Sequence, residues 1–368
     1  MILTEHTVRN YRNIEEAHFC PSPGLTVLCG RNGQGKTNLL ESIWLLSGAK
    51  SFRGSRDVQL VRRGEPYAVI ESAARREDDR REEYRIVIGG ENAAAAGVHP
   101  GRNAQLDGVD FGRATNLAGH FYAVVFSPAH LDLVRGAPEG RRRFVDAALM
   151  QLYPGYIPIY RRYIRALAQK NALLRDARRF EGLEELLEPF DAALAAAGGE
   201  MIRRRGDYLK GLFEIAGETY DNLAAGSEQC SFAYLPSAEG PADLLCRIRA
   251  ARAADLRAGY CTVGPHREDF KIEIGGADAR AFGSQGQQRS AALSLKLAEA
   301  RQIAKIAGSE PVMLLDDVLS ELDENRRDFL LGRIEGRQVI LTSCEAAAVH
   351  DTPGGIWEME QGRLRQIQ

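Results

Sequence analysis

The residues with the clearest chemistry lie near the start of the chain, in the string Gly30-Arg31-Asn32-Gly33-Gln34-Gly35-Lys36-Thr37. This string fits the pattern G-x-x-x-x-G-K-[ST] of a phosphate-binding loop (P-loop). Its glycines let backbone N–H groups curl around phosphate oxygens, and a helix starting at Lys36 adds partial positive charge there. Lys36 would reach the β- and γ-phosphates of a nucleotide such as ATP, and the Thr37 hydroxyl would ligate Mg²⁺. The alternative is a glycine-rich turn without a ligand, which the preceding strand pattern and the following helical pattern disfavour.

Two acidic residues, Asp316 and Asp317, end the apolar run Val312-Met313-Leu314-Leu315. Such a run is typical of a buried parallel strand that delivers carboxylates to the carboxyl edge of a sheet. Asp316 would hold the Mg²⁺ shell, and Asp317 would orient or deprotonate an attacking water. Taken alone, the string could also be a strand that runs into an acidic turn.

A third segment, Phe282-Gly283-Ser284-Gln285-Gly286-Gln287-Gln288-Arg289, precedes a helical pattern that stops at Gly308. Ser-x-Gly-Gln at a helix start offers backbone N–H groups and a hydroxyl to a phosphate. The alternative is an ordinary helix cap, for which serine is a preferred residue.

These three segments need a framework of strands and helices, and the hydrophobic periodicity predicts an α/β fold. Strand patterns at residues 25–29, 271–274, 312–315 and 339–342, with a closing hairpin at 356–367, predict one mixed sheet built from both ends of the chain. Residues 66–110 predict an antiparallel β subdomain, and three- and four-residue apolar spacing after residue 138 predicts helices. We therefore expect an inserted α-helical domain at 136–255, between two parts of a nucleotide-binding domain at 1–135 and 256–368.

Composition excludes several other classes of protein. The 368 residues are 44% hydrophobic and 27% charged, which is typical of soluble globular chains. No apolar stretch is long enough for a membrane span and the first residues do not resemble a signal peptide, so we expect a cytoplasmic protein. Six scattered cysteines without a C-x-x-C pair argue against a zinc site and a disulfide framework.

Charge alone does not decide whether the protein binds nucleic acid. The formal net charge is −2, yet only seven of the 48 basic residues are lysines, so arginine patches matter. The candidate DNA contacts are Arg141, Arg142, Arg143, Arg161 and Arg162. Arginines on a solvated helix face, or arginines that anchor the helical domain, are the alternative interpretations.

The order of P-loop, Ser-x-Gly-Gln and acidic strand resembles that of the ABC ATPases, and the long spacing between the first and last of these resembles their SMC-like branch. Within that branch the chain resembles the RecF family of bacterial DNA replication and repair proteins over almost its full length. The strings that carry this resemblance are Asn10-Tyr11-Arg12-Asn13, Asn32 to Glu41, Ser51-Phe52-Arg53, Phe126-Ser127-Pro128, Arg142-Arg143-Phe144-Val145-Asp146, Gly264-Pro265-His266-Arg267-Glu268-Asp269 and Leu314 to Asp323. The block around His266 discriminates best, because transporter ATPases lack it.

The resemblance implies an ABC-type ATPase head and an ATP-dependent homodimer that sandwiches two ATP molecules. Ser284, Gln285, Gly286 and Gln287 would then act in trans on the partner's nucleotide. It also implies that Arg12 reaches the nucleotide and that Ser320 and Asp323 belong to the D-loop that couples the two sites. Roles for His266 and Arg267 are implied without a stated chemistry, and a turn fixed by Gly264-Pro265 with a hydrogen-bonded histidine is the alternative.

The chain departs from the family pattern at three places. Ala129-His130 stands where the family often has Glu-Asp, so no side chain can be assigned to the Q-loop position. The strand ending Leu341-Thr342-Ser343-Cys344 lacks the histidine that is typical of transporters, and two adjacent aspartates replace an Asp-Glu pair. These departures predict slow hydrolysis. Together with what the family resemblance implies, they lead us to expect a weak, DNA-dependent ATPase whose main role is ATP-gated DNA binding.

The family resemblance further implies partners and a pathway. It implies binding to single-stranded DNA and to gapped or junction duplexes, cooperation with RecR and RecO in loading RecA, and support of the SOS response. The alternatives are an SMC-like structural clamp head, which would need long heptad arms that the inserted block lacks, and a transporter nucleotide-binding subunit. A transporter subunit would need a membrane partner.

Overall fold

A computed structural model describes residues 1–177, 182–226, 228–344 and 354–367. By compactness the chain divides into unit 1, Met1–Asp132 with Ala292–Gln368, and unit 2, Leu133–Ala291. Residues 256–291 were assigned to the ATPase domain from the sequence, but by compactness they belong to unit 2. The domain borders at residues 135 and 255, which were predicted from function, stay predictions. No helix among the described residues is long and apolar enough to cross a membrane.

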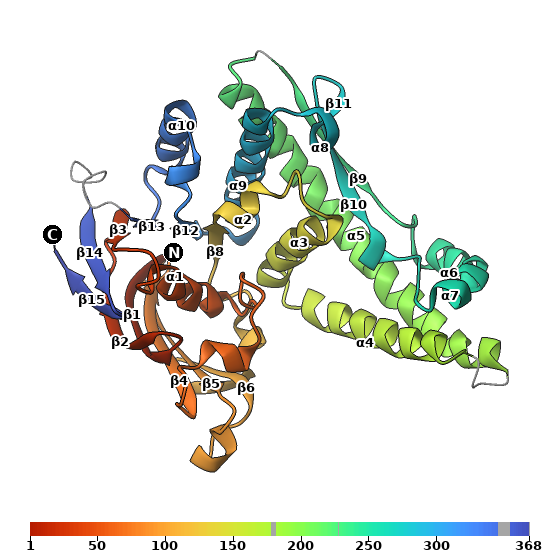
Figure 1. The fold of residues 1–368 in the computed structure, drawn as a ribbon, viewed down its shortest axis with the longest axis horizontal. Helices are drawn as coiled ribbons and strands as arrows, with labels where there is room; N and C mark the ends of the chain where they lie inside the picture. The colour runs from red at the N-terminus through yellow and green to blue at the C-terminus, as the bar shows by residue number, and fades with distance from the viewer. Residues whose placement is uncertain (178–181, 227, 345–353, 368) are drawn as a thin grey trace. The chain divides into compact units, whose positions relative to one another are not determined.

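Unit 1 contains a central six-stranded sheet that is assembled from distant parts of the chain (Figure 1). Its order is β15 (Arg363–Gln366), β14 (Gly355–Glu360), β3 (Leu25–Cys29), β13 (Val339–Ser343), β12 (Val312–Asp316) and β8 (Ala123–Phe126). All neighbours are parallel except the β14–β15 hairpin. The predicted mixed sheet built from both ends of the chain is thus confirmed, and all five residues of β12 are buried.

The second sheet of unit 1 is antiparallel throughout. Its order is β2 (Ile14–Phe19), β1 (Ile2–Tyr11), β4 (Tyr67–Arg75), β5 (Arg81–Gly89), β6 (Gly101–Leu106) and β7 (Val109–Arg113). Helix α1 (Lys36–Trp44) contacts β1 of this sheet and β8, β12 and β13 of the central sheet. The predicted antiparallel subdomain is therefore present, and α1 packs against strands of both sheets.

Within the described residues of unit 1, three further α-helices complete the framework. They are α2 (Pro128–Leu131), α10 (Glu324–Ile334) and the part of α9 (Gln285–Ala307) from Ala292 onward. Helix α9 ends before Gly308, whose φ of 64° is left-handed and suits glycine. The predicted helix after the Ser-x-Gly-Gln segment, with its stop at Gly308, is thus confirmed.

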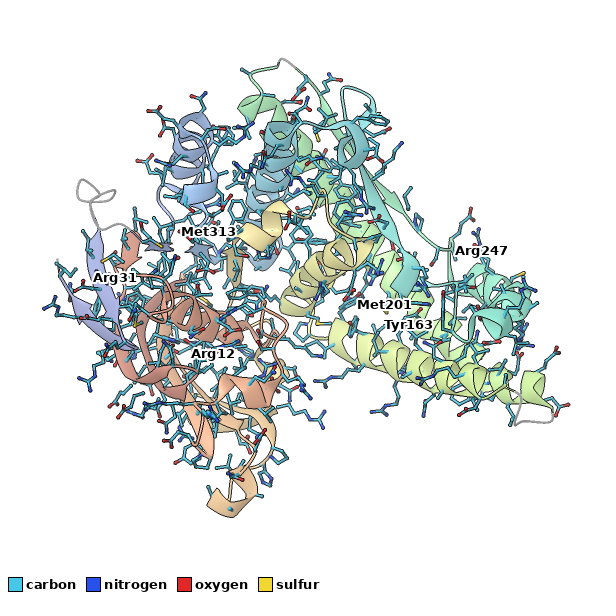
Figure 2. The ribbon with its side chains drawn as sticks, viewed as in Figure 1. Arg12, Arg31, Tyr163, Met201, Arg247 and Met313 are labelled. Atoms are coloured by element: carbon cyan, nitrogen blue, oxygen red, sulfur yellow. The ribbon has the colours of Figure 1, made fainter. Side chains whose placement is uncertain are left out.

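Unit 2 is mainly helical. Its helices are α3 (Pro138–Leu152), α4 (Tyr156–Arg175), α5 (Leu183–Leu223), α6 (Pro241–Ala250), α7 (Arg252–Ala258) and α8 (Ala279–Phe282). Tyr163 of α4 and Met201 of α5 are both buried in its core (Figure 2). A Cβ on Gly199 would lie 2.5 Å from the Pro241 ring, so this glycine lets α6 approach α5 closely.

A small antiparallel sheet lies in unit 2 as well, in the order β11 (Ala277–Asp278), β10 (Asp269–Ile274) and β9 (Cys230–Leu235). Strand β10 was predicted from the sequence as part of the mixed sheet, but it pairs with β9 and β11 instead, so that placement was wrong. Strand β9 was not predicted, because it falls within the range 136–255 that was expected to be helical. The burial of β9 alternates, with Cys230, Phe232 and Tyr234 less exposed than Ser231, Ala233 and Leu235. Because the exposed positions include apolar Ala233 and Leu235, the sequence itself shows little of the apolar–polar alternation by which strands are recognised.

Candidate functional site

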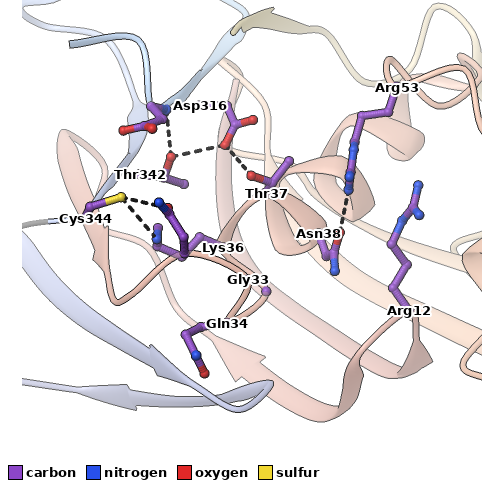
Figure 3. Close-up of a pocket in the computed structure, with 13 residues that line it drawn as sticks. Arg12, Gly33, Gln34, Lys36, Thr37, Asn38, Arg53, Asp316, Thr342 and Cys344 are labelled. Carbon is purple, nitrogen blue, oxygen red and sulfur yellow. Dashed lines mark hydrogen bonds between the residues drawn. The ribbon is translucent and has the colours of Figure 1, made fainter. Parts of the chain in front are cut away.

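A cavity of about 360 Å³ in unit 1 brings together the P-loop and the acidic end of β12 (Figure 3). Residues 32–38 line one side of it. The other lining residues include Asp316 at the end of β12, Thr342 in β13, and Asp317 and Cys344 directly after these strands. Arg12, from the turn between β1 and β2, and Arg53 complete the lining. The cavity therefore sits at the carboxyl ends of parallel strands and at the N-terminus of α1, where phosphate groups bind in α/β folds.

Glycines allow the P-loop to make its tight path. Gly30 has a φ of 142°, and a Cβ there would lie 2.3 Å from the carbonyl oxygen of Met359 on β14. Gly35 has a φ of 120° and directly precedes α1. Both positions need the freedom of glycine, because other residues are strained at these angles.

Lys36 is folded against its own loop. Its Nζ donates hydrogen bonds to the carbonyl oxygens of Gly30 and Arg31, and its residue surface is only 7% exposed. The Sγ atom of Cys344 lies 3.9 Å from Nζ and 3.0 Å from Oδ1 of Asn32. The lysine ammonium is thus held at the centre of the loop whose backbone N–H groups would face a phosphate.

Asp316 meets the P-loop directly. Its Oδ1 accepts hydrogen bonds from Thr37 Oγ1 at 2.7 Å and from Thr342 Oγ1 at 3.2 Å. Burial raises the pKa of Asp316, and the charge of Asp317 adds to this, while the two hydroxyl bonds and Arg53 lower it. The net pKa is above the usual value of 3.8, so a cation near this carboxylate would be favourable.

The donor set around Asp316 fits Mg²⁺. A hydroxyl oxygen from Thr37 and a carboxylate oxygen from Asp316 are hard ligands, and Mg²⁺ in nucleotide sites uses few carboxylates, with waters and phosphate oxygens as the other ligands. Within the described residues, no group of three or more His, Cys, Asp and Glu could enclose a metal ion. The chain would thus contribute only part of a coordination shell here.

Asp317 and the segment that follows it have a defined local structure. Asp317 has a left-handed φ of 51°, and its N–H donates to Thr342 Oγ1 at 2.8 Å. The predicted D-loop residue Ser320 donates from its hydroxyl to the carbonyl of Asp317 at 2.7 Å, and Asp323 caps α10 by accepting from the N–H of Arg326 at 3.0 Å. Ser320 is exposed, so this segment is accessible at the surface of unit 1.

Two turns brace the P-loop from outside, which the sequence analysis did not predict. In the β1–β2 turn, Asn13 Nδ2 donates to the carbonyls of Gly33 at 3.3 Å and Gln34 at 3.0 Å. In the β14–β15 turn, two N–H groups donate to Gln34. The N–H of Gly362 donates to the carbonyl of Gln34 at 3.0 Å, and the N–H of Gln361 donates to the side-chain Oε1 of Gln34 at 2.5 Å. Gln361 and Gly362 are more than 300 residues from the loop in sequence, and Asn13 belongs to the β1–β2 hairpin. Local sequence patterns therefore could not reveal these contacts.

Arg12 and Arg53 supply the cations at the other side of the cavity. Arg12 forms a two-pronged ion pair with the buried Glu41, at 2.5 and 2.9 Å. Arg53 donates to Asn38 Oδ1 at 2.8 Å (Figure 3). The sequence analysis assigned Arg12 to the site on family resemblance but gave no role to Arg53, Asn38 or Glu41, although all three belong to the strings that carry that resemblance.

The predicted trans-acting segment lies in unit 2 and begins α9. The N–H of Ser284 donates to Gln287 Oε1 at 2.7 Å, and the N–H of Gln287 donates to Ser284 Oγ at 3.2 Å. This reciprocal pair is a capping box. Ser284 and Gln285 are exposed, while Gln287 also donates to Glu228 Oε2 at 2.6 Å. Ser284 thus caps α9 in this structure, as the alternative interpretation expected. A phosphate-binding role for the exposed Ser284 stays a prediction.

The structure removes Arg141 from the candidate DNA contacts. Its side chain is 4% exposed, and its guanidinium donates to both carboxylate oxygens of Asp269, at 2.6 and 2.8 Å. Arg142 is half-buried and donates to the carbonyl of Glu268 at 2.7 Å. Both anchor α3 at the start of β10, through Asp269 in the strand and Glu268 just before it. This is the anchoring role that was left open from the sequence. Arg143, Arg161 and Arg162 are exposed.

The block around His266 forms a turn in unit 2 whose histidine is fully hydrogen-bonded. His266 Nδ1 lies 2.6 Å from the hydroxyl of Tyr163, and Nε2 lies 2.9 Å from the carbonyl oxygen of Cys261. Burial lowers the pKa of His266 to about 4. Arg267 is exposed and lies over the ring of Tyr260 at 4.8 Å. The structure therefore agrees with the turn interpretation for His266.

Comparison with known proteins assigns this architecture to a class. The model of the RecF/RecN/SMC N terminal domain family matches residues 2–361. A solved SMC head domain from Pyrococcus furiosus has a TM-score of 0.54 and 16% identity, covering all of this chain and 96% of that one, which shows a shared fold. The chain therefore has the fold of an SMC-type ABC ATPase head with an inserted helical region.

Closer relatives define the family within this class. "DNA replication and repair protein RecF" of Heliobacterium modesticaldum is 38% identical over 97% of this chain and 96% of its own length. The RecF of Agathobacter rectalis is 36% identical over 93% of this chain and 92% of its own length. Two solved structures of the recombination mediator protein RecF in the RecFOR pathway, RecF-ATPrS and RecF-ATP, have TM-scores of 0.90 and 0.89 at 32% identity, covering all of this chain and 98% of theirs. This chain belongs to the RecF family.

Proposed function

We propose that this protein is an ATP-dependent DNA-binding protein of recombinational DNA repair and replication restart. The observation that carries the proposal is the contact between Thr37 Oγ1 and Asp316 Oδ1 at 2.7 Å, beside the P-loop lysine, in one cavity at the start of α1. This arrangement suits a nucleoside triphosphate with Mg²⁺ held by Thr37 and Asp316. The RecF-ATP structure, which resembles this chain over its full length, supports ATP as the nucleotide.

The P-loop residues would each serve a part of the nucleotide. Backbone N–H groups of residues 30–37 would bind the phosphates, and Lys36 would exchange its carbonyl partners for phosphate oxygens. Bound Mg²⁺ would supply charge neutralisation at the γ-phosphate. Asp317, next to Asp316 and held by Thr342, would orient or deprotonate the attacking water in a slow, DNA-dependent hydrolysis.

The proposed working form is a homodimer that ATP holds together. Ser284, Gln285, Gly286 and Gln287 would contact the γ-phosphate bound by the partner, and Ser320 and Asp323 would couple the two sites. Because ATP would bind the dimer better than the separated protomers, mass action would shift the equilibrium toward the dimer. Hydrolysis would remove these contacts and release DNA.

We further propose that the dimer binds DNA at gaps and single-strand/double-strand junctions, in the cytoplasm. There it would meet RecR and RecO, help to load RecA and support the SOS response. Membership of the RecF family and the likeness to RecF of the RecFOR pathway support these partners. Residues 1–135 and 256–368 would form the ATPase head in this arrangement, with residues 136–255 as the inserted helical domain.

Sedimentation velocity with ATP, Mg²⁺ and a gapped DNA duplex tests this proposal. Wild type should sediment as a dimer only with ATP and should then bind the duplex, whereas Lys36→Arg should stay monomeric. Lys271→Arg is a matched control, since Lys271 is exposed and pairs only with Glu273 among the described residues. A wild-type mass and DNA affinity that ignore ATP would refute the proposal.

A further inference from the structure

Glu41 is a fully buried carboxylate on α1 that accepts hydrogen bonds from three residues in two separate segments. It is 0% exposed and does not line the cavity. Its Oε2 accepts from the hydroxyl of Tyr11 at 3.0 Å and from Nε of Arg12 at 2.5 Å. Its Oε1 accepts from Nη2 of Arg12 at 2.9 Å and from the hydroxyl of Ser51 at 2.5 Å. A buried charge with this many donors is well compensated, so it fixes all of them in place.

The Ser51 branch extends this control to the loop that carries Arg53. While Ser51 Oγ donates to Glu41, it accepts from the backbone N–H groups of Arg53 at 3.2 Å and Ser55 at 3.3 Å. Arg12 Nη2 in turn donates to Ser55 Oγ at 2.8 Å. The contacts form a closed ring, from Glu41 through Ser51 and Ser55 to Arg12 and back to Glu41.

Both arginines attached to this ring line the nucleotide cavity (Figure 3). Arg12 Nη1 makes no hydrogen bond within the described part of the chain, so it is available to an anionic ligand. The backbone of Arg12 has a left-handed φ of 52°, which costs conformational energy in a residue with a Cβ. The guanidinium is therefore held at the cavity by a strained turn and by one buried carboxylate.

We propose that Glu41 is a positioning residue for the nucleotide site: it holds Arg12, and through Ser51 the Arg53 loop, in the arrangement that receives the phosphates of ATP. This inference rests on the proposed function. Glu41 itself touches no ligand. Its effect comes from fixing two long cationic side chains before ATP binds, so that less side-chain entropy is lost on binding.

A double-mutant cycle on ATP affinity tests the inference. Titration with a fluorescent ATP analogue and Mg²⁺ should show that Glu41→Gln weakens binding roughly tenfold, the usual order for a lost coupling between residues in one network. In an Arg12→Ala/Arg53→Ala background the same substitution should change affinity less than twofold, because the side chains that it positions are gone. A purely structural Glu41 would weaken binding equally in both backgrounds, which would overturn the inference.

Glu82 provides a matched control in the same unit. It is also 0% exposed and accepts hydrogen bonds from two arginines, Arg76 and Arg80, and from the hydroxyl of Tyr84. It does not line the cavity. Glu82→Gln should lower the Tm as Glu41→Gln does but should leave ATP affinity unchanged. Equal losses of affinity in the two variants would mean that any buried carboxylate of unit 1 matters, and the inference would fail.

Ser51→Ala keeps the test decisive if Glu41→Gln does not fold. It removes one hydroxyl and leaves the Glu41–Arg12 ion pair intact. We expect Ser51→Ala to weaken ATP binding a few-fold in the wild-type background and to have no effect in an Arg53→Ala background. An ATP affinity that Ser51→Ala leaves unchanged in the wild-type background would count against the inference. If wild type itself does not bind the analogue, the proposed nucleotide site fails instead, which is a distinct result.

Discussion

Asp316 combines a functional carboxylate with a local cost in stability. Its pKa is raised in the folded protein, chiefly by burial and further by the charge of Asp317. A carboxyl group with a raised folded-state pKa destabilises the fold at neutral pH, where it is ionised, and this cost disappears as the pH falls and it becomes protonated. The contacts with Thr37 and Thr342 need only an acceptor at Oδ1, which asparagine also supplies.

Asp316→Asn should therefore raise the Tm at pH 7.5 without ligand and abolish the further rise that Mg²⁺ and ATP produce in wild type. Thermal unfolding with and without Mg²⁺-ATP measures both effects. The Tm gain should shrink as the pH is lowered, because wild type then loses the same charge. A variant with a lower Tm and an intact Mg²⁺-ATP response would contradict this account.

His266 should make unit 2 sensitive to acid. Its pKa is lowered from 6.5 to about 4, first by burial and also by Arg267 and Arg142, against the raising effects of the Cys261 carbonyl and Asp255. The neutral histidine thus contributes stability that is complete above pH 6.5 and is lost as the pH falls toward 4, by up to about 3 kcal/mol.

Urea unfolding of wild type and His266→Asn between pH 7.5 and 4 measures this contribution. The variant should be less stable at pH 7.5 by about 1–2 kcal/mol, because it loses the bonds to Tyr163 and Cys261. The difference between the two free energies of unfolding should narrow as the pH falls and should change sign near pH 4, because the stability that wild type loses there exceeds the difference at pH 7.5. A difference that stays constant would show that His266 does not titrate in this range.

At the scale of elements, the β14–β15 hairpin is a support of the P-loop. Gly362 has a φ of 77°, and a Cβ there would lie 2.4 Å from the carbonyl oxygen of Asn13. Gly336 has nearly the same φ, 78°, but a Cβ there would meet nothing within 4 Å. A comparison of alanine substitutions at these two glycines therefore separates the cost of backbone strain from the cost of the steric contact with Asn13.

Gly336→Ala should cost about 1 kcal/mol of unfolding free energy, from the left-handed backbone alone. Gly362→Ala should cost roughly 2–4 kcal/mol, because the Cβ also pushes the β1–β2 turn away from Gln34. Only Gly362→Ala should weaken ATP binding as well. Chemical denaturation and nucleotide titration check these expectations, and equal effects of the two substitutions would argue against a brace.

The elements were predictable to different degrees for physical reasons. The P-loop, β12 and α9 have local patterns, because each combines a buried apolar run with glycines or acids at its end. Strand β9 was not predicted because its exposed face carries apolar residues, Ala233 and Leu235, which obscure the alternation in the sequence. The brace at Gly362 and the burial of Arg141 depend on contacts between residues far apart in sequence, with Asn13 and Asp269 as the partners. A single sequence does not reveal such pairs.

At the scale of the whole molecule, DNA binding should depend on exposed arginines of unit 2. Replacing Arg143, Arg161 and Arg162 together by glutamine should weaken binding to a gapped duplex and lower the slope of log affinity against log salt by about 2 to 3, one for each lost phosphate contact. Arg81, Arg85 and Arg365, exposed on the sheets of unit 1, form the control set. Anisotropy titrations at several salt concentrations measure both quantities, and an unchanged slope would leave these arginines with a structural or solvating role.

The strand order of the central sheet has a consequence for synthesis of the protein on the ribosome. Strand β3 lies between β13 and β14, so the strand that leads into the P-loop has both of its partners more than 300 residues later in the chain. While the nascent chain is shorter than that, both edges of β3 lack the strands that cover them in the finished protein, and such edges invite aggregation. The nucleotide site can form only after β13 and β14 have left the ribosome. Until then the nascent chain must avoid aggregation, or be protected by a chaperone, before ATP can stabilise it.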